Sequence, residues 1–309
     1  MRTAFVDALI AAASQDERVC LLTGDLGYTT LEPFQAKFPE RFLNLGVAEQ
    51  NLVGFAAGLA LAGRVPIVYS IATFLTLKPL EQIRNDVCYQ KLNLKLVGVG
   101  AGLTYSQYGA THQALEDLAL MRVLPHMTVV CPGDPVEVEK AVAAILANDG
   151  PCYLRIGAKG EPRIHADGVE FRLGKGIVVS EGTELALFAT GNMLANTVAA
   201  ARLLEARGLK PRVVSMHTIK PLDDELLEDT FLRFRYVLCV EEHSLIGGLG
   251  SALSERIAER VERPFQFRRI AVADGFQETG GWLDFIRDKN GLSPEAIART
   301  AWAHCRQVP

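Results

Sequence analysis

The chain has 309 residues, of which 49% are hydrophobic and 22% charged, with a formal net charge of -4. This length supports two domains with real cores, and the lack of long basic runs argues against nucleic acid or an anionic membrane as a partner. No apolar run reaches the roughly 20 residues of a membrane span, and the first residues predict an amphipathic helix rather than a cleavable signal. We therefore expect a cytoplasmic protein that does not contact membranes.

Short apolar strands alternate with helices along the first half of the chain. The pattern predicts strands over residues 19–23, 41–46, 65–71, 94–100, 127–132 and 152–157, with helices over 1–17, 31–38, 47–62, 79–91, 114–124 and 134–148. A glycine turn presents Asp25 after the first strand, and Phe74 follows the strand at 65–71. Such alternation is typical of βαβ units around a parallel sheet, whose ligand side lies at the carboxyl ends of the strands.

The second half repeats this pattern after a break. Residues 158–175 collect Gly, Pro and charge and predict a linker, and strands and helices resume at Gly176, including a strand over residues 211–218. Ser293 followed by Pro294 indicates the start of a final helix. We predict an α/β fold with two doubly wound domains, residues 1–165 and 176–309, in which the sheets are mostly parallel.

The stretch 44–63, NLGVAEQNLVGFAAGLALAG, places Glu49 at the head of a helix that is apolar on every side. This pattern predicts a helix buried all round, and Gly54 and Gly58 one turn apart predict close packing of another backbone, so we expect an interface helix. Glu49 could simply complement the helix dipole. A buried carboxylate nevertheless needs a partner, so the position also indicates a functional group.

The cysteines and histidines give no metal signature. The six cysteines are scattered without a CxxC pair, and the six histidines lack HxH or HExxH spacing. We expect reduced thiols and predict no metal site.

Several motifs carry a family resemblance. FLNLGVAEQNLVGFAAGLALAG, FLTLKPLEQIRNDV and GATHQALEDLALMRVLPHMTVVCPGDPVE, in this order, resemble the pyrimidine-binding domain of transketolases and deoxyxylulose-phosphate synthases. VVSMHTIKPLD and VEEHSLIGGLGSAL resemble the C-terminal domain of the same enzymes. Full-length members carry a preceding diphosphate-binding domain with a GDG signature, which neither GDL at Gly24 nor GDP at Gly133 matches in context. The chain thus resembles the C-terminal half of a split transketolase.

The resemblance implies thiamine diphosphate as cofactor. Glu49 matches the glutamate that hydrogen-bonds the ring nitrogen of the cofactor's aminopyrimidine, and a low dielectric strengthens that contact. Phe74 matches an aromatic residue on the pyrimidine face. Asp25 matches an aspartate near the thiazolium ring. Without the resemblance, Asp25 is a turn residue and Phe74 a core residue at a strand end.

The resemblance also implies substrate contacts. His112 matches a histidine at the substrate carbonyl and hydroxyls, where it can donate a proton, and otherwise it is a helix-start residue. Arg155 matches an arginine that reaches substrate phosphate, and otherwise it is a solvated strand-end residue. Tyr108, beside Gln107, replaces a family aspartate that reads a donor hydroxyl; we expect both to line the substrate site.

A second departure concerns a frequent family arginine, which is Leu77 here and is followed by Lys78. Both departures lie on the substrate side, so they predict an unusual or modified sugar donor. His243 follows a strand of the second domain, and we favour a structural role for it over one at the site entrance or a subunit contact.

We therefore expect the β-like subunit of a two-subunit transketolase that moves a two-carbon ketol unit from a ketose to an aldose. The resemblance implies an N-terminal diphosphate-binding partner that holds most of the diphosphate and magnesium, in an α2β2 heterotetramer. Sugars or sugar phosphates are the expected substrates. A 2-oxoacid dehydrogenase or acetoin-type β subunit is an alternative, although THQ followed by ED at residues 111–117 argues against it. A non-catalytic scaffold is another, opposed by the joint presence of Glu49, Phe74 and His112.

Overall fold

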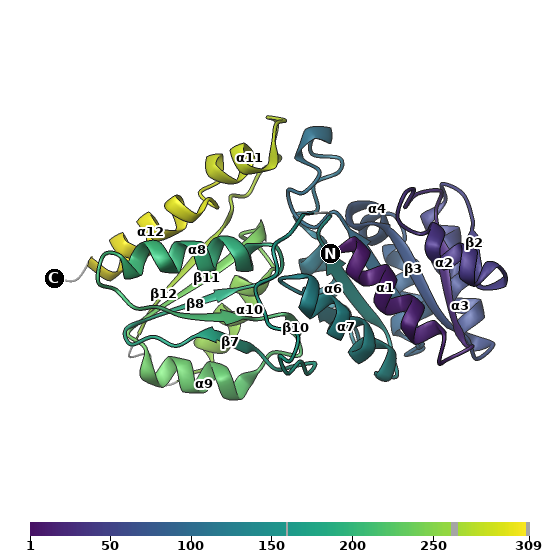
Figure 1. Ribbon diagram of the computed structural model, residues 1–309, viewed down its shortest axis with the longest axis horizontal. Coiled ribbons are helices and arrows are strands. Elements are labelled where there is room, and N and C mark those ends of the chain that lie inside the picture. The colour runs from purple at the N-terminus through teal and green to yellow at the C-terminus, as the bar shows by residue number, and fades with distance from the viewer. Residues whose placement is uncertain (159, 261–264, 307–309) are drawn as a thin grey trace.

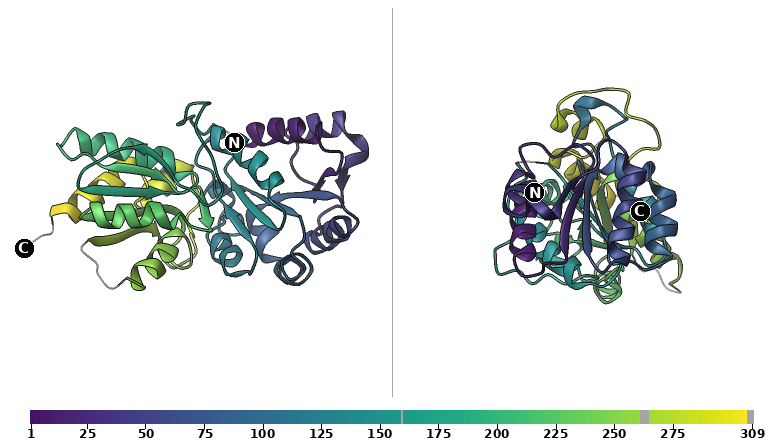
Figure 2. Two further views of the ribbon diagram at one scale, coloured as in Figure 1. Left: turned by 90° about the horizontal axis from the view of Figure 1, so that it is seen from below. Right: turned by 90° about the vertical axis from the view of Figure 1, so that its right-hand side faces the viewer.

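The computed structural model describes residues 1–158, 160–260 and 265–306. Two α/β units lie side by side along the long axis of the molecule. The first is formed mainly by the N-terminal half of the chain and the second by the C-terminal half (Figure 1). Figure 2 shows each sheet between helices on both faces. Both sheets are mostly parallel, which confirms the predicted fold class.

The first sheet has seven strands in the order β10-β5-β6-β4-β3-β1-β2, and all neighbours pair in parallel except β10 and β5. Its strands are β1 (Val19–Thr23), β2 (Phe42–Asn44), β3 (Val65–Ile71), β4 (Lys95–Val99), β5 (Thr128–Val130), β6 (Cys152–Ile156) and β10 (Thr218–Lys220). Successive residues of a strand point to opposite faces, so Leu21 joins one core and Leu22 the other.

Helices cover both faces of this sheet. The face that receives Leu21 is covered by α1 (Arg2–Ala13), α2 (Glu32–Lys37) and α7 (Pro135–Ala147). The other face is covered by α3 (Glu49–Leu61), α4 (Ala72–Leu77), α5 (Leu80–Gln82), the π-helix η2 (Ile83–Cys88) and α6 (Asp117–Val123). Two short 3₁₀ turns, η1 (Pro39–Arg41) and η3 (Ser106–Tyr108), lie in connecting loops.

The second sheet has five strands in the order β12-β11-β8-β9-β7, with β7 antiparallel at one edge. Its strands are β7 (Ile177–Ser180), β8 (Leu185–Ala189), β9 (Arg212–Ser215), β11 (Tyr236–Ser244) and β12 (Gln266–Val272). Its helices are α8 (Met193–Glu205), α9 (Asp224–Arg233), α10 (Leu249–Ala258), α11 (Leu283–Lys289) and α12 (Pro294–Arg306). The backbone of Ala296 donates to the Ser293 hydroxyl, which confirms the predicted cap of the final helix.

Three local predictions need correction. The strand predicted over 211–218 ends at Ser215, and β10 then crosses over to extend the first sheet. Phe74 lies on the short helix α4 rather than at the end of a strand, and the helix predicted over 79–91 is divided between α5 and η2. No residue from 160 to 175 is in a helix or strand, and residue 159 lies outside the described part of the chain.

Within this chain alone, α3 is buried on one side only, so its role as an interface helix stays a prediction. Phe55 is 44% exposed and Leu61 64% exposed. A Cβ atom added to Gly54 or Gly58 would meet nothing within 4 Å. One side of α3 packs on the sheet through residues such as Leu52 and Ala56, while an apolar stripe on the opposite side faces outward.

Candidate functional site

Glu49 is the first residue of α3, and its side chain faces inward. Only 1% of the residue is exposed. One carboxylate oxygen, Oε2, accepts a hydrogen bond from Lys78 Nζ at 2.9 Å, and the lysine side chain is 44% exposed. A buried carboxylate is costly unless it is paired, so Lys78 supplies the countercharge that this position needs.

Phe74 lies one helical turn before Lys78 and joins it to the next functional residue. The Lys78 ammonium is 4.7 Å from the centroid of the Phe74 ring, within the range of a cation–π contact. The Phe74 ring meets the His112 imidazole edge-on, with centroids 5.1 Å apart and an interplanar angle of 68°. Glu49, Lys78, Phe74 and His112 therefore form one continuous group, which we call the Glu49–His112 cluster.

His112 is half-buried in the loop that joins β4 to α6. Its Nδ1 lies 2.9 Å from the hydroxyl of Thr111, and its ring is 5.2 Å from the ring of Tyr108. Tyr108 is 59% exposed, and Gln107 beside it is also exposed. The three residues thus line the outer side of the cluster, where a ligand could reach them.

The second half of the chain holds this loop in place. The backbone amide of Leu103 donates to Glu242 Oε1 at 2.6 Å, and the Ser106 hydroxyl donates to the carbonyl of Gly281 at 2.8 Å. Gly102 has φ +57°, and a Cβ there would come within 2.7 Å of Glu242. Glycine at this position therefore allows the close approach of loop and β11.

Asp25 lies at the carboxyl end of β1, in a turn with φ +57°. Its Oδ1 accepts hydrogen bonds from the Tyr28 hydroxyl at 2.7 Å and from Asn44 Nδ2 at 3.0 Å. These two bonds, that from Tyr28 first, lower the pKa of the exposed Asp25 carboxyl. The hydrogen bonds of Asp25 in the described part of the chain connect it to Tyr28 and Asn44 rather than to the Glu49–His112 cluster.

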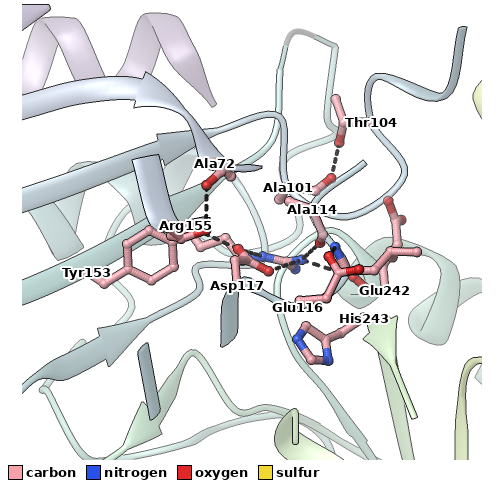
Figure 3. A network of polar contacts seen from close by, with 12 residues as sticks. Ala72, Ala101, Thr104, Ala114, Glu116, Asp117, Tyr153, Arg155, Glu242 and His243 are labelled. Atoms are coloured by element: carbon pink, nitrogen blue, oxygen red, sulfur yellow. Dashed lines mark hydrogen bonds and ion pairs between the residues drawn. The ribbon is translucent and has the colours of Figure 1, made fainter. Parts of the chain in front are cut away.

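Arg155 is buried, whereas the resemblance implied a contact with substrate phosphate and the residue pattern alone a solvated strand end. It is 2% exposed, and its guanidinium donates to Asp117 through Nε at 2.7 Å and through Nη2 at 3.0 Å. Nη2 also donates to the carbonyls of Ala114 and Glu242, while the Tyr153 hydroxyl donates to Asp117 at 2.6 Å. Figure 3 shows Asp117 between Tyr153 and Arg155.

Through these hydrogen bonds, Arg155 on β6 is connected to α6 and to β11 inside the protein. Burial alone would lower the pKa of Arg155, but the Asp117 carboxylate raises it above its usual value, so the guanidinium stays charged. Its bonded and buried position does not support the expected contact with substrate phosphate, and we leave Arg155 out of the proposed substrate site.

His243 is also buried. Its Nδ1 lies 2.8 Å from the carbonyl of Ser244, and its Nε2 accepts a hydrogen bond from the backbone amide of Ala119, as a structural role requires.

Lys78 and Asp117 are the residues whose roles the sequence did not indicate. Lys78 lies 29 positions from Glu49, and Asp117 lies 38 positions from Arg155, so no local spacing connects either pair. A charged residue within the otherwise apolar strand YLRIG, with two acids at residues 116–117, is the one signal that could have pointed to a buried ion pair.

The cluster fits the aminopyrimidine of thiamine diphosphate. A buried carboxylate can share a proton with a ring nitrogen, and an aromatic side chain can stack on a flat heterocycle.

The described residues contain no group of three or more His, Cys, Asp or Glu side chains that could hold a metal ion. All six cysteines are free thiols. Among the helices of the described residues, none is both long and apolar enough to span a membrane.

Comparison with known proteins places this geometry in a family. The model of the transketolase pyrimidine binding domain matches residues 1–159, and that of the transketolase C-terminal domain matches residues 174–282. The chain therefore belongs to the transketolase family, as its motifs predicted. It represents the C-terminal subunit of a thiamine-diphosphate-dependent transketolase divided over two chains, since it matches only the last two transketolase domains and its relatives of similar length include named transketolase subunits and a putative transketolase C-terminal section.

Two curated relatives are similar over most of their length. The 6-deoxy-6-sulfo-D-fructose transketolase subunit SqwH of Clostridium sp. (strain MSTE9) is 37% identical over 302 residues, which cover 97% of this chain and 93% of the relative. One of the subunits of the apulose-4-phosphate transketolase of Actinobacillus succinogenes is 36% identical over 271 residues, 88% of this chain and 87% of the relative. A solved split-gene transketolase, described as an inactive β4 tetramer, has a TM-score of 0.90 and 38% identity, covering 98% of this chain and 97% of that one.

Proposed function

We propose that this chain moves a two-carbon ketol unit from a ketose donor to an aldose acceptor, with Glu49 activating the aminopyrimidine of thiamine diphosphate. The observation that carries the proposal is the position of Glu49. Its carboxylate is 1% exposed and is joined through Lys78 to the face of Phe74, which in turn contacts His112. Thiamine diphosphate supplies the electron sink needed to break a carbon–carbon bond beside a carbonyl.

Three residues are proposed on the cofactor side of the site. Glu49 would hold the ring nitrogen of the aminopyrimidine, and its buried position would strengthen that hydrogen bond. Phe74 would pack on the pyrimidine face. Asp25, whose carboxyl is held as an anion, is proposed near the thiazolium ring from the family resemblance.

On the substrate side, His112 would donate a hydrogen bond to the substrate oxygen on which negative charge develops. Tyr108 and Gln107 are proposed to contact the donor hydroxyls. A phenol at residue 108 is bulkier than a carboxylate and carries no charge at neutral pH. The two relatives above are named for a sulfonated and a phosphorylated sugar, so an acidic ketose is the first donor class to screen.

The outward stripe of α3 supports a subunit partner. Phe55 and Leu61 are exposed there, and Gly54 and Gly58 leave room for close backbone approach. We propose that this side of α3 packs in an α2β2 heterotetramer with an N-terminal subunit that holds the diphosphate and magnesium. A cytoplasmic location stays a prediction from the hydropathy pattern of the sequence.

The substitution Glu49→Gln tests this function in the assembled two-subunit enzyme. Glutamine keeps the shape but cannot share a proton with the ring as a carboxylate does, so turnover should fall by about three orders of magnitude or more. Assembly of the two subunits, measured by sedimentation, should be unchanged. Glu40→Gln, at an exposed position, is the matched control. Normal turnover by Glu49→Gln would rule out the proposed activation of the cofactor.

A further inference from the structure

Lys78 makes the two contacts that the cofactor's aminopyrimidine would make. Its ammonium lies 2.9 Å from Glu49 Oε2 and 4.7 Å from the centroid of the Phe74 ring. The carboxylate and the aromatic face are the same two groups proposed to hold the pyrimidine ring. One cation therefore occupies both of the interactions that this part of the cofactor needs.

The two ends of this ion pair differ in their freedom to move. The Glu49 side chain is 2% exposed, at the start of α3, whereas the Lys78 side chain is 44% exposed. A lysine has a long flexible stem, and its head can turn into water at little cost. The Glu49 carboxylate is fixed at the start of the helix, and without Lys78 it would remain buried with no partner. Exchange at this site would thus move the lysine and leave Glu49 in place.

Lys78 is also the one cation that the described residues place against Glu49. Nearby Glu81 is engaged instead with Gln82 and Asn85. When Lys78 leaves, the Glu49 carboxylate can accept from another donor. A flat ring that donates to Glu49 and stacks on Phe74 would restore both the hydrogen bond and the contact with the aromatic face.

We propose that Lys78 is a placeholder that competes with the cofactor, and that binding of thiamine diphosphate transfers Glu49 from the Lys78 ammonium to the aminopyrimidine. This proposal rests on the proposed function of Glu49. It predicts that Lys78 weakens cofactor binding, while it keeps the buried carboxylate paired as long as the cofactor is not bound. The lysine is thus a positioning residue rather than a catalytic one.

The test measures the dissociation constant of thiamine diphosphate, at saturating magnesium, in the complex of this chain with its diphosphate-binding partner. Lys78→Met removes the charge but keeps the length, and it should lower the dissociation constant about fivefold, since a partly exposed ion pair contributes up to about 1 kcal/mol. Lys78→Arg can hold a carboxylate through two hydrogen bonds and should raise the dissociation constant. Lys140→Met on α7 is the control and should change nothing.

A second pair of variants checks that the effect passes through Glu49. In the Glu49→Gln background, Lys78→Met should no longer change the dissociation constant, because the ion pair is already lost. Lys78→Gln, which keeps a neutral donor for Glu49, replaces Lys78→Met if that variant is unstable. An unchanged or higher dissociation constant for the neutral variants would overturn the proposal. Absence of binding by the unsubstituted complex would instead contradict the proposed function itself.

Discussion

The Phe74 ring lies edge-on to the imidazole of His112, with centroids 5.1 Å apart and an interplanar angle of 68°. This contact joins helix α4, which follows β3, to the loop that follows β4. The residue proposed for the cofactor face therefore touches the residue proposed for the substrate. In an open parallel sheet, such meetings occur where neighbouring strands end, which is the usual place for a ligand site.

His112→Asn should lower turnover of the assembled enzyme by about 10²- to 10⁴-fold, because it removes a proton donor at the substrate oxygen. Binding of thiamine diphosphate should be preserved, since Glu49 and Phe74 remain. Steady-state kinetics and cofactor titration separate the two effects. His126→Asn, at an exposed position outside the proposed site, is the control for loss of an imidazole from the same domain. Undiminished turnover by His112→Asn would remove His112 from the catalytic role.

Phe74→Leu should weaken binding of thiamine diphosphate about fivefold to tenfold, because aromatic contact contributes about 1 kcal/mol beyond its buried area. The measurement is the cofactor dissociation constant of the two-subunit complex. Tyr89→Leu, at a residue that is 84% exposed, is the control for loss of an aromatic ring from the same domain. Equal dissociation constants for Phe74→Leu and the unsubstituted complex would show that Phe74 belongs only to the core.

Arg155→Met should destabilise the chain by about 3 to 5 kcal/mol, because it leaves the Asp117 carboxylate buried without its countercharge. The free energy of unfolding in urea measures this loss. Arg172→Met is the control, because its ion pair with Glu170 lies at the surface and should contribute little. A stable Arg155→Met variant with a raised KM for a phosphorylated sugar would return Arg155 to the substrate site.

Glu137 predicts a pH dependence of stability. Burial raises the pKa of its carboxyl to about 7, although Gly133 N–H donates to Oε2 and His165 Nε2 lies 3.5 Å from Oε1. The folded chain thus holds a proton that the unfolded chain, with its ordinary value of 4.5, releases earlier. The stabilisation is complete below about pH 4.5 and is lost as the pH rises to about 7.

Glu137→Gln cannot titrate at this position, so it should not show this loss. Relative to the unsubstituted chain, it should gain about 1 to 3 kcal/mol between pH 4.5 and pH 8. Urea unfolding of both proteins at the two pH values measures the difference, in which the contributions of other titrating groups largely cancel. A stability difference that is the same at both pH values would mean that Glu137 does not change its protonation on unfolding.

The alternation of apolar strands and helices was sufficient to predict the two mostly parallel sheets, because each strand and helix carries its own periodicity. β10 was missed because three residues are too few to show a period, and its pairing with β5 is non-local. The sequence could not show which side of α3 faces outward, because an apolar side chain has the same pattern whether it faces a core or another subunit.

The site was predictable where the motifs of the family specify a residue, as for Glu49, Phe74 and His112, which the structure brings into one cluster with Lys78. Arg155 shows the limit. Its sequence position resembles a strand end, but its environment depends on Asp117 and on the Glu242 carbonyl of the second sheet. The fold creates such contacts between distant segments, and no local pattern reveals them.

The most direct measurement is a titration with thiamine diphosphate and magnesium, monitored by circular dichroism. It is made first on this chain alone and then on the chain together with its diphosphate-binding partner. Our account predicts binding only when both subunits are present, because this chain supplies the pyrimidine side of the site. Tight, magnesium-dependent binding by the chain alone would contradict the proposed division of the site, and no binding in either experiment would contradict its role in thiamine chemistry.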